Sequence, residues 1–192
     1  MKNKALAIFF MLFLTASLFS QTKPLRAAVF LLEPFMMTDP EHREVTGAVI
    51  DYWQEFLAPR MNREIEVVGL FPILRLEKML ESGEIDIAPL FTKIPTREER
   101  FLYPETPLSE IISCLIVLPD SPIQEAKTTE DLKNTRIGFI EGGYIPPMLK
   151  DPSITIELVS SEDYRKINLN KLFAGRIDAL LDINYISLQY YL

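Results

Sequence analysis

Short apolar runs alternate with helical patterns along most of this 192-residue chain, and the alternation limits the folds it can adopt. Residues 25–32 are almost entirely apolar and lie between Pro24 and Pro34, as expected of a strand buried on both faces. Further runs of this kind occupy residues 64–68, 85–90, 111–118, 136–140, 155–159 and 177–181. Buried strands alternating with helices are typical of parallel sheets, so we expect an α/β protein.

Three helices are predicted between these strands from apolar residues at helical spacing. Their apolar faces comprise Val49, Trp53, Phe56 and Leu57; Ile73, Leu76, Met79 and Leu80; and Ile167, Leu169, Leu172 and Phe173. Gly83 and Gly175 follow the second and third helices as stop signals. Thr96 and Glu99 fit a capping box, which predicts a helix that begins at Thr96.

The first twenty residues have the pattern of a secretory signal peptide. Lys2 and Lys4 precede an uncharged apolar run at 5–19, which ends in small and polar residues. We therefore expect an exported, periplasmic protein, with an uncleaved membrane anchor as the alternative. Without residues 1–20 the net charge changes from −7 to −9, because 18 basic residues face 27 acidic ones. The acidic balance argues against a nucleic-acid partner.

The cysteine and histidine content argues against several kinds of site. Cys114 is the only cysteine and lies in an apolar run, where a small buried residue is expected. His42 is the only histidine and lies in a polar stretch, which supports neither a zinc site nor a Ser/His/Asp triad. We expect no metal, no other cofactor and no catalytic residues.

The chain divides near residue 118. Residues 119–127 hold two prolines and no apolar periodicity, as expected of a connector. We predict a first lobe at 24–112, a hinge or crossing strand at 113–119 and a second lobe at 120–192.

Several segments together resemble the family 3 extracellular solute-binding proteins. These segments are LRAAVFLLEPF, TGAVIDYW, LESGEIDIAPLFTKIPTREERFLYPETPL, EDLKNTRIGFIEGGY and FAGRIDALLD. The most specific part is S-G-x-I-D followed by T-x4-R. The resemblance implies the two-lobed type II periplasmic-binding-protein fold, with a small solute held between lobes that are joined by two crossing strands. It also implies a final segment that returns to the first lobe, and we expect this chain to be truncated before it.

Thr92 and Arg97 match the family pair that holds the α-carboxylate of an amino acid. A guanidinium suits this role, because its planar fork of donors fits a carboxylate. The alternative is a surface arginine that pairs with Glu98 or Glu99.

A glycine turn and two aromatic rings complete the expected pocket walls. Gly142 and Gly143 match the family turn that presents backbone donors to the solute, and Tyr144 follows as a stacking candidate. The alternative is an ordinary strand-to-helix turn. Phe35 and Phe91 are the candidate aromatic platforms.

The acid for the solute's positive end is less well defined by the resemblance. Asp182 stands one residue before the family position counted from Asp178, and one step in a strand reverses the direction of a side chain. Glu33 and Glu141 are alternative acids at strand ends, where open α/β sheets tend to place binding residues.

The resemblance implies a receptor that delivers a small carboxylate-bearing solute, such as an amino acid, to an inner-membrane ABC permease. A solute-sensing module for a membrane signalling protein is the alternative. A lyase-like exported enzyme, with Glu33 or Glu141 as general acid or base, is a minor one.

Overall fold

The computed structural model describes residues 23–39, 41–110 and 112–191. The predicted signal peptide lies outside these residues. The elements in chain order are β1 (Leu25–Val29), β2 (Met37–Thr38), β3 (Val45–Thr46), α2 (Ala48–Tyr52), the π-helix η1 (Trp53–Leu57), α3 (Ala58–Met61), β4 (Ile65–Leu70), α4 (Ile73–Glu81), α5 (Pro95–Glu98), β5 (Cys114–Ile116), the 3-10 helix η2 (Thr129–Leu132), β6 (Arg136–Ile140), the 3-10 helix η3 (Pro147–Lys150), β7 (Thr155–Val159), α6 (Tyr164–Phe173), β8 (Ala179–Asp182) and α7 (Tyr185–Tyr191). None of the helices within the described ranges has the length and apolar character needed to cross a membrane.

The first sheet pairs β1 and β4 in parallel, with Leu25 opposite Ile65. The last three residues of β1 are fully buried, as the apolar run predicts. The run at 85–90 does not form a strand: Ile87 makes a single parallel bridge to Ala27. The short antiparallel pair β2–β3 lies outside this sheet.

The second sheet has the strand order β5-β8-β6-β7. β6 pairs in parallel with β7 and with β8, whereas β5 pairs with β8 in the antiparallel direction, with Cys114 opposite Asp182. β6 and β7 have the bounds predicted from sequence. Ile137, Phe139 and Leu180 are fully buried in this sheet, and Tyr164 of α6 is buried with them.

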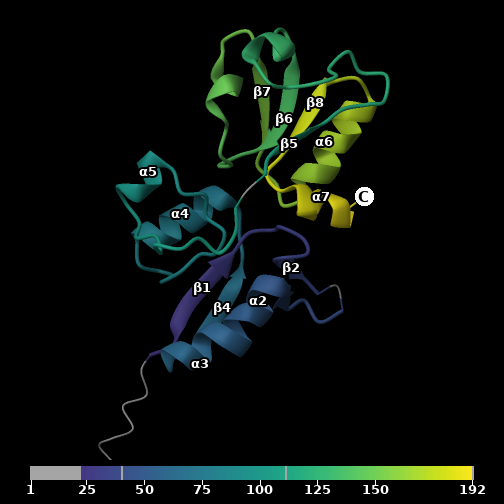
Figure 1. Ribbon diagram of the computed structural model, residues 1–192. Coiled ribbons are helices and arrows are strands. Elements are labelled where there is room, and N and C mark those ends of the chain that lie inside the picture. The colour runs from purple at the N-terminus through teal and green to yellow at the C-terminus, as the bar shows by residue number, and fades with distance from the viewer. Residues whose placement is uncertain (1–22, 40, 111, 192) are drawn as a thin grey trace, which may run out of the picture.

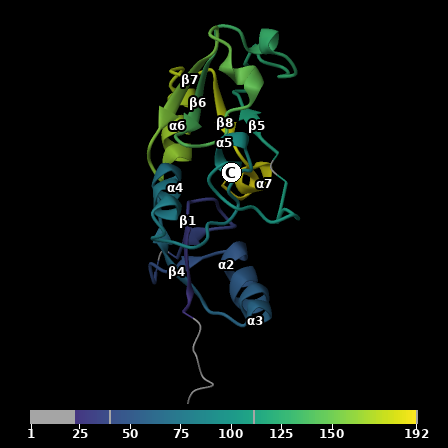
Figure 2. The ribbon, with the colours of Figure 1, turned by 90° about the vertical axis from the view of Figure 1, so that its left-hand side faces the viewer.

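The two sheets lie in separate halves of an elongated molecule (Figures 1 and 2). We call the half with β1 and β4 the first lobe and the half with β5–β8 the second lobe. α4, α5 and α7 lie at the level where the halves meet in both views. The predicted two-lobed α/β architecture with mainly parallel sheets is therefore confirmed.

Two further local features differ from the sequence prediction. The helix over residues 48–61 contains the π turn η1, and Phe56 is 47% exposed rather than on the buried face with Trp53. The wider π turn changes the side-chain register of the helix. α5 begins at Pro95 with Ile94 as its N-cap, so Thr96 caps no helix. Proline favours the first helical position because it has no N–H to satisfy and its φ is already helical.

Candidate functional site

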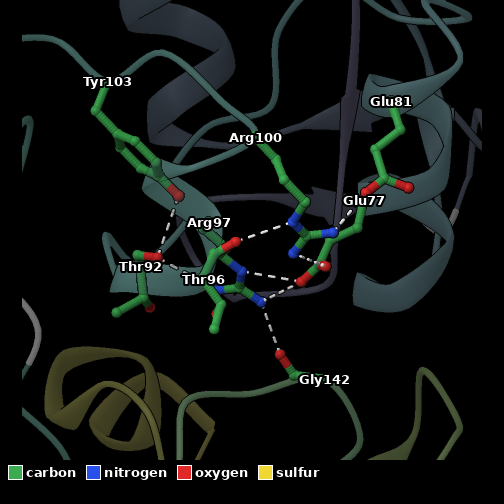
Figure 3. A network of polar contacts seen from close by, with 8 residues as sticks. All are labelled: Glu77, Glu81, Thr92, Thr96, Arg97, Arg100, Tyr103 and Gly142. Carbon is green, nitrogen blue, oxygen red and sulfur yellow. Dashed lines mark hydrogen bonds and ion pairs between the residues drawn. The ribbon is translucent and has the colours of Figure 1, made fainter.

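Arg97 is buried where the two lobes meet, with only 4% of its surface exposed. The short helix α5 carries it, and its side chain extends toward α4 and the glycine turn of the second lobe (Figure 3). The predicted alternative, a surface arginine paired with Glu98 or Glu99, does not occur within the described residues. Lys93 pairs with Glu98 instead.

The Arg97 guanidinium contacts both lobes (Figure 3). Its Nε and Nη2 donate to Glu77 Oε1 at 2.9 and 2.7 Å. Nη2 also donates to the carbonyl of Gly142 at 2.9 Å, and Nη1 donates to the carbonyl of Thr92 at 3.3 Å. The guanidinium carbon lies 4.3 Å from the centre of the Phe91 ring, which is a cation–π distance. Arg97 therefore links α4, the loop at Thr92 and the second lobe.

Glu77 is shared between two arginines. Its Oε1 accepts from Arg97, and its Oε2 accepts from Arg100 Nη2 at 2.9 Å. Arg100 also pairs with Glu81. Burial by itself would raise the pKa of Glu77, but the hydrogen bonds and charges of the two arginines hold it below its ordinary value of 4.5. Glu77 therefore supplies a carboxylate of the protein itself to Arg97, the arginine that is expected to bind the carboxylate of a solute.

Thr92 and Phe91 lie beside Arg97. The carbonyl oxygen of Thr92 accepts from Arg97 and, at 3.2 Å, from the hydroxyl of Tyr103. Phe91 packs edge-on against Phe30 and Phe101. The loop is therefore fixed through the backbone of Thr92 and the ring of Phe91.

The glycine turn faces the first lobe. Gly142 has φ of +83°, and a Cβ there would lie 3.0–3.1 Å from side-chain atoms of Ile73 and Leu74. The N–H of Gly143 donates to Ile140 within the turn, and a Cβ on Gly143 would lie 2.5 Å from the Phe139 ring. The contact with the first lobe thus comes from Gly142, while Gly143 packs inside the second lobe.

Asp182 is fully buried and paired within the second lobe. It accepts from Arg165 Nε at 2.7 Å and from Nη2 at 3.3 Å, and the N–H of Asn184 donates to it at 3.1 Å. Arg165 Nη2 also donates to Ser187 Oγ at 2.8 Å. These groups connect α6, the end of β8 and the start of α7.

Glu33 and Phe35 follow β1 in the first lobe. Glu33 Oε2 lies 3.9 Å from Arg165 Nη1, so this ion pair joins the two lobes. Phe35 is half-buried against the core, and its carbonyl accepts from the N–H of Val49. Tyr144 is half-buried after the glycine turn.

Two cavities open between the lobes. The larger has about 360 Å³ of empty space, part of it open to solvent, and it is lined by Phe30, Leu31, Phe71, Pro72, Ile73, Leu74, Ile140, Glu141, Val159, Ser160, Ser161 and Glu162. The smaller is lined by Leu32, Leu90, Ser109, Ile183 and Asn184, and its empty space of about 250 Å³ also includes open solvent. Both are lined from both lobes, and Glu141 faces the larger.

Sequence reasoning did not single out Glu77 or Arg165. Glu77 lies on the predicted helix at 73–80 among charged neighbours, and Arg165 precedes Lys166 near a helix start; both patterns are typical of solvated faces. Only the fold brings these residues to buried partners. In the described ranges, no group of three or more metal-ligating side chains is assembled.

Comparisons with known proteins bear on the fold. No protein-family model matches the sequence, and no curated protein matches it. Among solved structures, the ancestral amino-acid-binding protein AncCDT-1, a precursor of cyclohexadienyl dehydratase, superposes with a TM-score of 0.71 at 21% identity, over 88% of this chain and 73% of the other. AbpA, an amino acid ABC transporter substrate-binding protein from Streptococcus pneumoniae bound to L-arginine, gives 0.70 at 19% identity, over 87% and 70%. The periplasmic VFT2 domain of BvgS from Bordetella pertussis gives 0.67 at 21% identity, over 87% and 68%. The resemblance expected from the sequence is thus confirmed at the level of the fold: this chain has the two-lobed α/β fold of the amino-acid-binding proteins.

Proposed function

We propose that this protein is an exported receptor that binds a small carboxylate-bearing solute between its lobes and delivers it to an inner-membrane ABC importer. The observation that carries the proposal is the position of Arg97. Its buried guanidinium donates to Glu77 in the first lobe and to the carbonyl of Gly142 in the second, so a carboxylate that takes the place of Glu77 on Arg97 lies at the boundary between the lobes. AbpA, which shares the fold, is a substrate-binding protein of an ABC transporter.

A solute carboxylate reaches Arg97 by exchange with Glu77. Glu77 also pairs with Arg100, so it keeps a cationic partner when the Arg97 fork turns to the solute. Its side chain is 15% exposed and is therefore not sealed from water. Thr92, Phe91 and the glycine turn at Gly142, followed by Tyr144, then form the walls around the bound carboxylate. Phe35 contributes its ring from the segment after β1.

Calorimetric titration of the full-length chain with the L-amino acids and small carboxylic acids tests the proposal. Arg97→Ala is expected to weaken binding by about 100-fold or more, because it removes a charged bidentate donor. The matched control is Arg60→Ala, which removes an exposed guanidinium that lies over the Phe56 ring in the first lobe and does not pair with Glu77. We expect this control to bind within about threefold of the unaltered chain.

Two outcomes contradict the proposal. One is a folded chain, judged by circular dichroism, that binds no compound in the panel. The other is equal binding by the Arg97→Ala and Arg60→Ala variants. Arg97→Lys keeps the positive charge but loses the planar fork of donors. It serves as a second test of the role of Arg97 if the alanine variant does not fold.

A solute-sensing module is the second candidate, and the shared fold of the BvgS VFT2 domain favours it. The two candidates use the same cleft but differ in the partner. A permease gene beside this one, together with solute uptake by vesicles that contain that permease, would favour the receptor. A neighbouring membrane kinase whose activity changes with solute would favour the sensor.

Binding without turnover is part of the proposal. AncCDT-1, which shares the fold, is a precursor of a dehydratase, so the lyase-like alternative is tested directly. NMR of each binding solute after prolonged incubation with the protein is expected to show no new product. Product formation that is lost in Glu33→Gln or Glu141→Gln would support the enzyme instead.

A further inference from the structure

Glu77 already occupies the guanidinium on which the proposed function depends (Figure 3). Its Oε1 accepts from Nε of Arg97 at 2.9 Å and from Nη2 at 2.7 Å. Nη2 also donates to the carbonyl of Gly142, and Nη1 donates to the carbonyl of Thr92. A guanidinium has five N–H donors, so these four hydrogen bonds leave only one of them for a solute. A solute carboxylate therefore needs the place that Glu77 holds.

The contact of Glu77 with Arg97 uses a single carboxylate oxygen. Nε and Nη2 of Arg97 both donate to Oε1, whereas Oε2 accepts from Nη2 of Arg100 at 2.9 Å. A solute carboxylate in this position can present one oxygen to each donor of Arg97, and such a bidentate pair is stronger than a contact through one oxygen. Glu77 is therefore a partner that a well-placed solute carboxylate can displace.

The charges around Arg97 are balanced without a solute. Arg97 and Arg100 form ion pairs with Glu77 and Glu81, so two positive charges face two negative ones. An added carboxylate brings one negative charge in excess, beside an arginine whose side chain is only 5% exposed. Water and salt screen such buried charges little. Glu77 thus opposes the binding of a carboxylate by its charge as well as by its position.

Arg100 gives Glu77 a position away from Arg97. The side chain of Arg100 is 37% exposed, so a Glu77 carboxylate that leaves Arg97 keeps a cationic partner and gains contact with water. Arg100 is itself anchored, because its Nε donates to the carbonyl of Thr96 at 2.9 Å and Glu81 is its second acid. The release of Arg97 therefore leaves no buried charge without a partner.

We propose that Glu77 is a built-in competitor of the solute: it occupies Arg97 until a solute arrives, lowers the affinity for carboxylates, and shifts onto Arg100 when a solute binds. The inference rests on the proposed function, in which Arg97 holds the solute carboxylate. Glu77 acts through Arg97 and is a positioning residue, not a contact of the solute. The competition selects carboxylates that fit both donors of Arg97, because a contact through one oxygen gains nothing over Glu77.

Glu77→Gln tests the competition, because it keeps the size of the side chain and removes its charge. L-arginine, L-glutamine, L-alanine and propionate are titrated calorimetrically into the full-length chain, each beside its primary amide, which lacks the carboxylate. We expect Glu77→Gln to bind the carboxylates about 5- to 20-fold more tightly than the unaltered chain does, with no such gain for the amides. A merely structural role for Glu77 predicts the opposite, because a damaged site binds less tightly.

Two further variants give the effect its sign. Glu81→Gln removes an equal charge from α4 but leaves Glu77 on Arg97, and its affinities are expected to stay within about threefold of the unaltered chain. Arg100→Ala leaves Arg97 as the one cationic partner of Glu77 among the described residues. It is expected to weaken the binding of the carboxylates by about 3- to 10-fold, because Glu77 then competes for Arg97 more strongly.

The inference is overturned if folded Glu77→Gln binds the carboxylates no more tightly than the unaltered chain, if Glu81→Gln shows the same gain, or if the amides gain as much. Should Glu77→Gln not fold, by circular dichroism, Arg100→Ala decides: weaker binding of the carboxylates supports the competition, and equal or tighter binding overturns it. Failure of every variant and of the unaltered chain to bind any probe would instead contradict the proposed function.

Discussion

The two buried arginines at the interlobe boundary are held in different ways. Arg97 pairs with Glu77, which is 15% exposed and is shared with Arg100. Arg165 pairs with Asp182, which is fully buried and, among the described residues, has Arg165 as its one cationic partner. An acid with two cationic partners and some access to water can release one of them, whereas a sealed single pair cannot. The first pair is therefore suited to exchange with a solute and the second to fixing the lobe.

The largest expected effect of this difference is on stability. Arg165→Met leaves Asp182 buried without a cationic partner and is expected to lower the free energy of unfolding by about 3–5 kcal/mol, measured by urea titration with far-UV circular dichroism. Arg136→Met is the matched control, because it breaks an exposed guanidinium–carboxylate pair with Asp178 and is expected to cost less than about 1 kcal/mol.

A double variant sharpens this test. Arg165→Met combined with Asp182→Leu removes both charges and is expected to recover part of the lost stability, because no charge is then left buried alone. Equal costs for Arg165→Met and Arg136→Met would show that the second-lobe pair is not sealed as the structure describes.

An intermediate effect on stability is expected from substitutions in the glycine turn, which contacts α4 and Arg97 of the first lobe. Gly142→Ala places a Cβ at a positive φ and 3.0–3.1 Å from Ile73 and Leu74 of the first lobe. Gly83→Ala introduces the same kind of backbone strain, at φ of +69°, with no atom within 4 Å of the new Cβ. We expect Gly83→Ala to cost about 1–2 kcal/mol and Gly142→Ala to cost about 1 kcal/mol more, in urea unfolding.

The difference between these two glycine variants measures the packing between the lobes. Equal costs would mean that Gly142 does not pack tightly against α4. The hydrogen bond between Arg97 and the carbonyl of Gly142 would then be the main contact between the glycine turn and the first lobe. Small-angle scattering provides a second measurement, because a Cβ wedged at the boundary is expected to increase the radius of gyration only in Gly142→Ala.

The sequence predicts the sheets better than it predicts the boundary between the lobes. The runs at 136–140 and 155–159 become β6 and β7 without change, because a continuous apolar run between turn signals is a local property. The run at 85–90 is equally apolar, yet it makes only the Ala27–Ile87 bridge, because strand pairing depends on distant partners.

The same limit applies to the candidate site. Thr92 and Arg97 are five residues apart in the sequence and lie side by side. Their contact depends only on the loop between them and on α5, which are local structures. The partners of the arginines are 20 residues away for Glu77 and 17 for Asp182, and they meet only through the packing of separate elements. Spacing along the chain therefore does not reveal which acids remain free for a solute.

The smallest expected effect is the pH dependence contributed by Glu77. Arg97 and Arg100 lower its pKa below 4.5 against the opposing effect of burial, so the folded state favours the ionised carboxylate. This stabilisation is present above pH 4.5 and is lost as the pH falls through the lowered pKa of the folded state. The stability difference between the unaltered chain and Glu77→Gln should thus be constant from pH 7 to 5 and shrink below about pH 4.5, by less than about 1 kcal/mol.

Urea midpoints from pH 3 to 7 measure this stability difference. Glu81→Gln, which removes a carboxylate of α4 that does not touch Arg97, is the control. If the difference instead grows toward low pH, Glu77 is not held ionised by the two arginines, and the contrast with the sealed Asp182 pair fails.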